Sequence, residues 1–354
     1  DGDFIKAQGT TLGADNGIGM ALMLAAITSD TLKHPALECL FTVDEETGLT
    51  GAFRLQDGCL QGKQLINLDS EDDGQVFIGC AGGIDTLAKM HYSPLALSPN
   101  SLIALQIKVG GLMGGHSGDD INKGRGNANK ILVRFLYQVM QATDMQLAMI
   151  NGGNLRNAIA REAEAVITIP MAYKEDIRIM LNHYIATIEQ EIGDVEKDFA
   201  MSLETTDMPA TIIPADKAKV LIQALYACPH GMTAMSKTMP GLVETSTNLA
   251  SVKMREDDKG AYIEINTSQR SSIESKKHDI KQMVECALAL ACDEVTHGDG
   301  YPGWAPNPQS PLLEVTKKAY ADLFAAEPKV LAIHAGLECG LFLEKYPYLD
   351  MVSI

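Results

Sequence analysis

The sequence predicts an α/β protein, with one domain built on a mostly parallel, doubly wound sheet and an inserted α+β domain with an antiparallel sheet. Two patterns in the 354 residues predict this fold. Near both ends of the chain, helix-length segments alternate with short apolar runs, which is typical of a doubly wound sheet. Between them, strand-like runs lead through polar turns into helix-like runs, which indicates α+β structure. We expect residues 1–83 and 296–354 to form the first domain and residues 84–295 the insertion.

Short apolar segments define the elements of the first domain. The run MALMLAAI follows a glycine-rich turn and predicts a helix over 18–28. ALECLFTV (36–43) has the length and the β-branched end of a buried strand, and QLINLD (64–69) predicts another strand. After residue 296 the run PLLEVTKKAYADLFAA predicts a helix, KVLAIHAG a strand and GLFLEK a further helix. This last segment is expected to rejoin the first domain.

The insertion shows a different pattern. SLIALQIKVGG (101–111) predicts a strand and NANKILVRFLYQVM (127–140) an amphipathic helix. A strand followed by a helix then occurs twice, over 162–188 and 260–290, although few residues match between the two copies. We interpret the two copies as a duplicated module.

The composition limits the classes of function. With 46% hydrophobic and 21% charged residues, the chain can bury large cores. A net charge of −17 argues against nucleic-acid binding, which needs a basic surface. The sequence contains no secretory signal and no run of about 20 apolar residues, so nothing points to a membrane. The seven cysteines are scattered and are expected to be reduced, buried thiols of a cytoplasmic protein.

Acidic residues follow several of the apolar runs. Asp15 lies in the glycine-rich turn, Glu45 and Glu46 follow the predicted strand 36–43, and Asp69 ends the run 64–69. Ligands of open α/β sheets bind at the carboxyl ends of the strands, so these carboxylates are expected to converge. Carboxylates this close repel one another unless a cation is bound. A metal site is therefore favoured, although Asp15 as a helix cap and the others as solvated turns remain alternatives.

The adjacent pair Glu45 and Glu46 suggests a division of roles. Neighbouring residues in a turn point in different directions, so one carboxylate can bind a metal while the other acts as a general base on water. An ordinary acidic turn is the alternative interpretation of the pair.

Several longer blocks carry a family resemblance. They include TLGADNGIGMA, FTVDEETGLTGAF, LINLDSEDDG, GGHSG, NGGNLRNAIAREA and IHAGLECGLF, and they extend over essentially the whole chain. These blocks resemble the co-catalytic zinc peptidases, a family that includes carboxypeptidase G and aminoacylase, and within it the bacterial aminoacyl-histidine (Xaa-His) dipeptidases. The resemblance implies a zinc-binding catalytic domain, a lid domain that binds the substrate, a dipeptide substrate and a homodimer.

The resemblance also implies roles for the acidic residues. Asp15 would bridge two zinc ions, which Co²⁺ or Mn²⁺ could replace. Glu46 would bind one ion and Asp69 the other, and Glu45 would be the general base.

Four further positions receive roles from the resemblance. His116, in a loop with five glycines, would stabilise the oxyanion, although a surface histidine is the alternative. Asn157 would bind the substrate amide and Arg270 its terminal carboxylate, for which Arg156 and Arg161 compete. Gly336 would offer its backbone to the substrate. His334 is expected to be structural.

Two histidine ligands implied by the resemblance are missing. The family has one in a His-x-Asp motif ahead of the bridging aspartate and another near its C-terminus, and neither motif occurs in these 354 residues. We therefore expect the chain to be part of a longer gene product, and Asp15, Glu46 and Asp69 without the two histidines to bind zinc weakly. An N-acyl-amino-acid amidohydrolase, a carboxypeptidase and a metal-depleted, non-catalytic module are the alternative functions.

Overall fold

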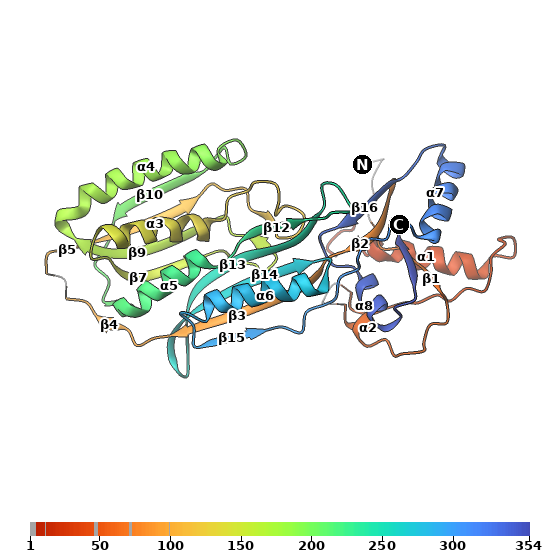
Figure 1. The fold of residues 1–354 in the computed structure, drawn as a ribbon, viewed down its shortest axis with the longest axis horizontal. Coiled ribbons are helices and arrows are strands. Elements are labelled where there is room, and N and C mark those ends of the chain that lie inside the picture. Colours follow the sequence, from red (N-terminus) through yellow and green to blue (C-terminus); the bar gives the residue numbers. More distant parts are fainter. Residues whose placement is uncertain (1–4, 11, 46–48, 71–72, 99) are drawn as a thin grey trace. The chain divides into compact units, whose positions relative to one another are not determined.

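The computed structural model describes residues 5–10, 12–45, 49–70, 73–98 and 100–354. It divides into two compact units, which we call unit 1 (residues 1–81 and 301–354) and unit 2 (residues 82–300) (Figure 1). No helix among the described residues is long and apolar enough to cross a membrane.

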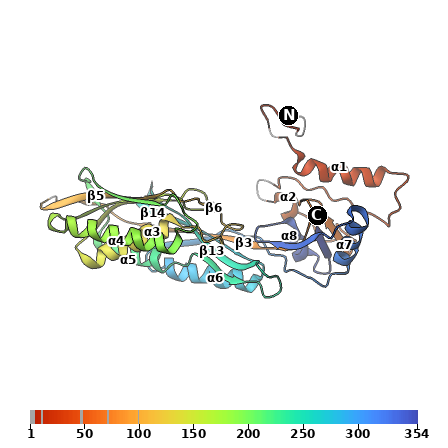
Figure 2. The ribbon, with the colours of Figure 1, turned by 90° about the horizontal axis from the view of Figure 1, so that it is seen from above.

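Unit 2 is built on a nine-stranded antiparallel sheet. Eight strands follow the order β10-β5-β9-β7-β13-β14-β3-β15, and β12 pairs with β13. Helices α3, α4, α5 and α6 lie along one face of this sheet (Figure 2). The strands are β3 (Gly82–His91), β5 (Leu102–Gly110), β7 (Gln146–Gly152), β9 (Ala163–Pro170), β10 (Ala200–Thr205), β12 (Gly231–Met235), β13 (Val243–Asp257), β14 (Gly260–Ser271) and β15 (Glu294–His297). The helices are α3 (Ala128–Ala142), α4 (Lys174–Ile192), α5 (Ala215–Ala227) and α6 (Glu274–Leu288).

Helix α3 shows how the sequence produces this packing. Asn127 caps its N-terminus, because the Asn127 side chain accepts a hydrogen bond from the backbone N–H of Lys130 at 3.2 Å. Apolar residues recur at helical spacing, and Ile131, Phe135 and Val139 are buried in the core against the sheet. The expected strand 101–111, the helix 127–140 and both strand-helix pairs are confirmed.

Two small pairs of strands complete unit 2. Strand β4 (Leu95–Ala96) pairs with β11 (Thr211–Ile212), and β6 (Gly115–His116) pairs with β8 (Ala158–Ile159).

Unit 1 has a four-stranded sheet in the order β1-β17-β2-β16. Strands β1 and β17 are parallel, β2 and β16 are parallel, and β17 meets β2 in antiparallel fashion, so the expected parallel sheet is seen in part. The strands are β1 (Gln64–Asn67), β2 (Gln75–Cys80), β16 (Lys329–Ile333) and β17 (Asp350–Ser353). The helices are α1 (Ala14–Thr28), α2 (Thr50–Phe53), α7 (Pro311–Phe324) and α8 (Glu338–Lys345).

The strand expected over 36–43 is not formed in the described part of unit 1. The Glu38 carboxylate instead accepts hydrogen bonds from the backbone N–H groups of Gln61 and Gly62, at 2.9 and 2.8 Å, which ties the segment to the loop before β1. An apolar run becomes a strand only where a neighbouring strand supplies its hydrogen bonds, and periodicity does not reveal that partner.

The burial of the cysteines also differs from the expectation. All seven are free thiols, as expected, but Cys59 and Cys286 are exposed rather than buried. Burial raises the pKa of the Cys80 thiol to about 11, which keeps this group protonated.

Candidate active site

The acidic residues selected from the sequence of unit 1 line a single cavity of about 730 Å³. Asp15, Glu45 and Asp69 lie in its wall, together with apolar side chains of α1 and of the segment 36–42. Glu46 lies outside the described residues. The cavity therefore joins three of the four predicted carboxylates.

Asp15 does not cap helix α1. The capping position is Gly13, and no side chain forms a cap hydrogen bond there. Asp15 itself has extended rather than helical backbone angles, with φ −88° and ψ 109°. The next residue connects the start of the helix to the end of β1, because the Asn16 amide donates a hydrogen bond to the Asp69 carboxylate at 3.2 Å.

The three carboxylates share the cavity without forming one coordination sphere. Within the described residues, Asp15, Glu45 and Asp69 do not place their ligand atoms within 4.8 Å of one another. The structure thus brings these residues to one cavity and leaves their role as metal ligands a prediction.

Glu338 is an acidic residue of the cavity that the sequence analysis missed. It is buried, and among the described residues its Oε1 has no hydrogen-bond partner. Burial raises the pKa of this carboxyl, and a hydrogen bond with Thr42 opposes the rise. Glu338 follows strand β16, so the strand-end reasoning that selected Asp69 could have found it. Glu338 thus adds a fourth carboxylate to the cavity lined by Asp15, Glu45 and Asp69, and carboxylate oxygens are ligands that divalent cations accept.

Two further predicted positions lie in the same segment of unit 1. A Cβ atom on Gly336 would lie 2.7 Å from Cε2 of Tyr301, so this position has no room for a side chain. Its contact with a substrate backbone stays a prediction. His334 is buried, in keeping with a structural role.

In unit 2, the loops that carry His116 and Asn157 are joined to each other. His116 ends strand β6 and faces Ala158 of β8. The backbone N–H of Ser117 donates to the carbonyl of Asn157 at 2.8 Å. Asn248, in the long strand β13, donates to the carbonyl of Ala158 at 2.8 Å. The pair of loops is therefore fixed to the sheet.

Two glycines before His116 are packed closely against other atoms of the protein, so a side chain would not fit at either position. Gly111 has φ +72°, and a Cβ there would lie 1.8 Å from the carbonyl oxygen of Asp198. Gly115 has φ +138°, and a Cβ there would overlap the guanidinium of Arg125. Arg125 donates to the carbonyl of Gly114 at 2.6 Å and pairs with Asp120 at 3.0 Å. At these two positions glycine allows close internal packing.

The His116 ring is held at one nitrogen. Its Nδ1 lies 3.2 Å from the Asp119 carboxylate and 3.3 Å from the backbone nitrogen of Gly118. The hydrogen bond with His116 lowers the pKa of the Asp119 carboxyl, and the positive charge of Arg270 lowers it further. Because Nδ1 is engaged, Nε2 is the nitrogen through which His116 can act on a ligand.

Arg270 is buried in the sheet, whereas its competitors are exposed. It lies in β14 between Gly83 of β3 and Ser246 of β13. Arg156 is exposed and pairs with Asp85 at 3.0 Å, and Arg161 is exposed as well. In unit 2, the His116 ring and the positive charge of Arg270 thus both act on the Asp119 carboxylate.

Comparison with known proteins identifies the family. Residues 107–196 match the peptidase dimerisation domain of M20 peptidases. The chain is 41% identical to the cytosol non-specific dipeptidase of Escherichia coli (strain K12), over all of this chain and 72% of that protein. A crystal structure of aminoacylhistidine dipeptidase from Vibrio alginolyticus superposes with a TM-score of 0.93, at 40% identity, over all of this chain and 71% of that one.

A more distant structure shares the fold alone. Aminopeptidase PepT from Bacillus cereus ATCC 10987 has a TM-score of 0.53 at 16% identity, over 99% of this chain and 66% of that one. Because the identity to the first two proteins extends over the whole chain, the protein belongs to the M20 peptidase family, in the group of aminoacylhistidine and cytosol non-specific dipeptidases.

Proposed function

We propose that the protein is a zinc-dependent dipeptidase that hydrolyses the peptide bond of Xaa-His dipeptides, including carnosine-like substrates. Its membership of a metallopeptidase family and the names of its dipeptidase relatives support this proposal. The observation that carries it is that Asp119 contacts His116, which could donate to an oxyanion, and is also influenced by the charge of Arg270, whose guanidinium suits a carboxylate.

The acidic residues of unit 1 would hold the metal. Asp15 would bridge two zinc ions, with Glu46 as a ligand of one and Asp69 as a ligand of the other. Zinc held by these residues would supply Lewis-acid activation of water and of the scissile carbonyl. Glu45 would act as the general base, with its carboxylate accepting the proton of the attacking water and passing it to the leaving amine.

The residues of unit 2 would bind the dipeptide. Nε2–H of His116 would donate a hydrogen bond to the developing oxyanion, while the backbone N–H groups of Gly118 and Asp119 donate to Nδ1 on the opposite side of the ring. Asn157 would bind the substrate amide, and Arg270 would hold the free carboxylate of the C-terminal residue. In unit 1, the backbone of Gly336 would contact the substrate.

Removing the substrate carboxylate tests this function. We expect wild type to hydrolyse a Xaa-His dipeptide with a kcat/KM about 10- to 150-fold above that of its C-terminal amide, because a charge-assisted hydrogen bond is lost. Arg270→Ala should remove most of this preference, and Arg178→Ala, an exposed residue of α4, should keep it. Equal hydrolysis of acid and amide by wild type would refute the role of Arg270. Hydrolysis only of N-acyl amino acids, or of longer peptides from their C-terminus, would assign the chemistry to an amidohydrolase or a carboxypeptidase.

The comparisons also support a location and an assembly. The name of the Escherichia coli relative places that protein in the cytosol, and we propose the same compartment here. The match of residues 107–196 to a dimerisation domain supports a homodimer. Sedimentation of the purified protein tests the dimer, and a monomer at all concentrations would contradict it.

A further inference from the structure

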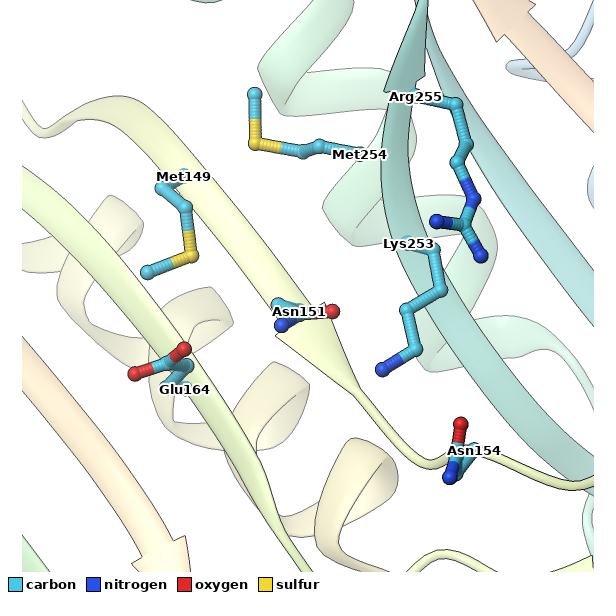
Figure 3. A pocket seen from close by; sticks show the side chains of 7 residues that line it. All are labelled: Met149, Asn151, Asn154, Glu164, Lys253, Met254 and Arg255. Atoms are coloured by element: carbon cyan, nitrogen blue, oxygen red, sulfur yellow. The ribbon is translucent and has the colours of Figure 1, made fainter.

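A second cavity, of about 430 Å³, lies in unit 2 on the face of the sheet away from the helices (Figure 3). Side chains alternate between the two faces of a strand. Glu164 and Lys253 line the cavity, whereas their neighbours Ala165 and Val252 belong to the core packed by the helices. The volume lies within the range of about 300–1,000 Å³ typical of small-molecule pockets.

The cavity arises where two strands separate. Strands β7 and β13 pair at a single described position, Gly152 opposite Val252, and beyond it they diverge (Figure 3). Asn151 lies on one side of the opening and Lys253 on the other, with Asn154 at its end. The divergence leaves a polar cavity between two strands of the same sheet.

Charges of both signs line this cavity. The Lys253 ammonium points between Asn151 and Asn154 (Figure 3), and no carboxylate among the described residues lies within ion-pair distance of it. Burial lowers the pKa of Lys253, the Arg255 guanidinium lowers it further, and the negative charge of Glu164 opposes both. Glu164 lies opposite Asn151 in the neighbouring strand and accepts a hydrogen bond from Gln106 at 3.1 Å, and Arg255 pairs with Glu264 at 3.7 Å. Lys253 and Glu164 thus lie on different strands of the cavity wall.

We propose that this cavity binds a small zwitterion with one ammonium and one carboxylate, the chemical class of a free α-amino acid. The ligand carboxylate contacts Lys253 and Arg255, and the ligand ammonium contacts Glu164 and the amide oxygen of Asn151. A simple anion meets the negative charge of Glu164, and a simple cation meets the positive charge of Lys253, so each is disfavoured. Met149 supplies an apolar contact for the ligand side chain. The proposal does not depend on the proposed catalytic residues, because none of them lines this cavity.

Methyl NMR of the protein labelled at methionine tests the proposal, because the side chain of Met149 lies in the cavity wall. The probe is L-alanine, since the imidazole of histidine would also bind metal ions. We expect a saturable shift of the Met149 methyl signal, which Met149→Leu assigns. Acetate and methylamine at the same concentrations should each cause less than about a tenth of this effect. No saturable shift with L-alanine, or an equal response to acetate, would overturn the proposal.

Variants separate this cavity from the proposed active site. Lys253→Gln and Glu164→Gln should each raise the Kd for L-alanine about tenfold or more, because each removes one charge-assisted contact. Lys89→Gln, on the same face but outside the cavity, should leave the Kd unchanged, with unchanged signals of the other methionines as a check on folding. Arg270→Ala should also leave it unchanged, whereas loss of the Met149 shift in this variant would assign the binding to the proposed active site and overturn the inference. A lower Kd for 4-aminobutyrate than for L-alanine would overturn the assignment to an α-amino acid, because the preferred ligand would have a wider spacing between its charges.

Discussion

Units 1 and 2 bury their apolar residues to different extents. In unit 2, helices α3, α4, α5 and α6 pack on a nine-stranded sheet around one continuous core. In unit 1, a smaller core surrounds Trp304, Phe342 and Tyr346. Helix α1 contributes little to that core, because Ile18 and Leu22 keep 62% and 57% of their surface exposed. Helix α3 of unit 2 is thus packed on one face, whereas the apolar side chains of α1 in unit 1 stay largely exposed.

This difference shows what a hydrophobic pattern determines. Helix α3 has one apolar face, so its sequence specifies both the helix and the side that packs. Helix α1 carries apolar residues all around, a pattern typical of a helix buried on every side, and the described residues cover it only in part. The proposed sites follow the same division. His116 and Arg270 are fixed by a sheet and by hydrogen bonds, whereas Asp15 and Asp69 line an open cavity.

The largest expected effect tests whether the open cavity of unit 1 is a metal site. Asp15→Ala should lose both zinc and turnover, because the bridging carboxylate offsets the repulsion of two cations. Metal analysis of the purified variant measures the loss. Asp30→Ala, an exposed residue just after α1, should retain wild-type metal content. Two zinc ions per chain in Asp15→Ala would remove Asp15 from the site.

A smaller effect on turnover is expected from replacing the proposed general base, and it distinguishes this residue from the metal ligands. Glu45→Gln should lower kcat by roughly 10²- to 10⁴-fold with nearly unchanged zinc content, because glutamine keeps the shape of the side chain but cannot accept the proton. Glu38→Gln changes another carboxylate of the cavity, one already bonded to backbone N–H groups, and should leave kcat nearly unchanged. Loss of zinc together with activity in Glu45→Gln would make Glu45 a ligand instead.

The strands and helices of unit 2 could be predicted more accurately from the sequence than those of unit 1. Its strands and helices are long and periodic, and the expected segments are found with shifts of one or two residues, as for α3. In unit 1 the run 36–43 fails as a strand because strand formation depends on a partner far away in the sequence. The mixed direction of the small sheet depends in the same way on β17, which no sequence pattern identified.

The sequence could predict which residues belong to the candidate site, but it could not predict how their side chains are arranged. Strand-end reasoning selected Asp15, Glu45 and Asp69, which share one cavity. The same reasoning was not applied to Glu338, and the support of His116 by Asp119 and Arg125 depends on a loop conformation that glycines with positive φ make possible. Contacts of this kind depend on tertiary structure and leave no periodic signal in the sequence.

A stability measurement can show whether the two units unfold separately. The Lys130 ammonium donates to the carbonyls of Leu225, Tyr226 and Cys228 at the end of α5, at 3.0, 2.7 and 2.8 Å. Lys130→Met should lower the free energy of unfolding of unit 2 by about 1–3 kcal/mol, because these carbonyls lose a charged donor.

The single tryptophan provides the internal control for this variant. Trp304 is buried in the core of unit 1, so its fluorescence reports on unit 1, whereas circular dichroism reports mainly on the larger unit 2. In urea, Lys130→Met should move the dichroism transition and not the fluorescence transition. Lys219→Met, on the exposed side of α5, should change stability by less than about 0.5 kcal/mol. Equal shifts of both signals in Lys130→Met would show that the units unfold as one.

The smallest expected effect is a pH dependence confined to unit 2. His91 lies between two carboxylates, with Nδ1 2.6 Å from Asp293 and Nε2 3.3 Å from Asp257. The hydrogen bond with Asp293, followed by that with Asp257, raises the pKa of His91 above its usual 6.5, while Lys89 and Lys259 are the nearby positive groups. Because the folded-state pKa is the higher one, this contribution to stability is complete below the unfolded-state value and is lost as the pH rises through the folded-state value.

Replacing His91 should therefore change the effect of pH on unfolding. The fall in stability between about pH 5.5 and about pH 9, measured by dichroism in urea, should be larger in wild type than in His91→Gln, because other titrating groups cancel in this difference. Trp304 fluorescence should give the same pH dependence in both proteins, since His91 belongs to unit 2 and Trp304 to unit 1. An identical dichroism profile for wild type and variant would mean that the His91 ion pairs are fully compensated by solvent, as many exposed pairs are. A change in the fluorescence profile would instead couple the two units and weaken the contrast between them.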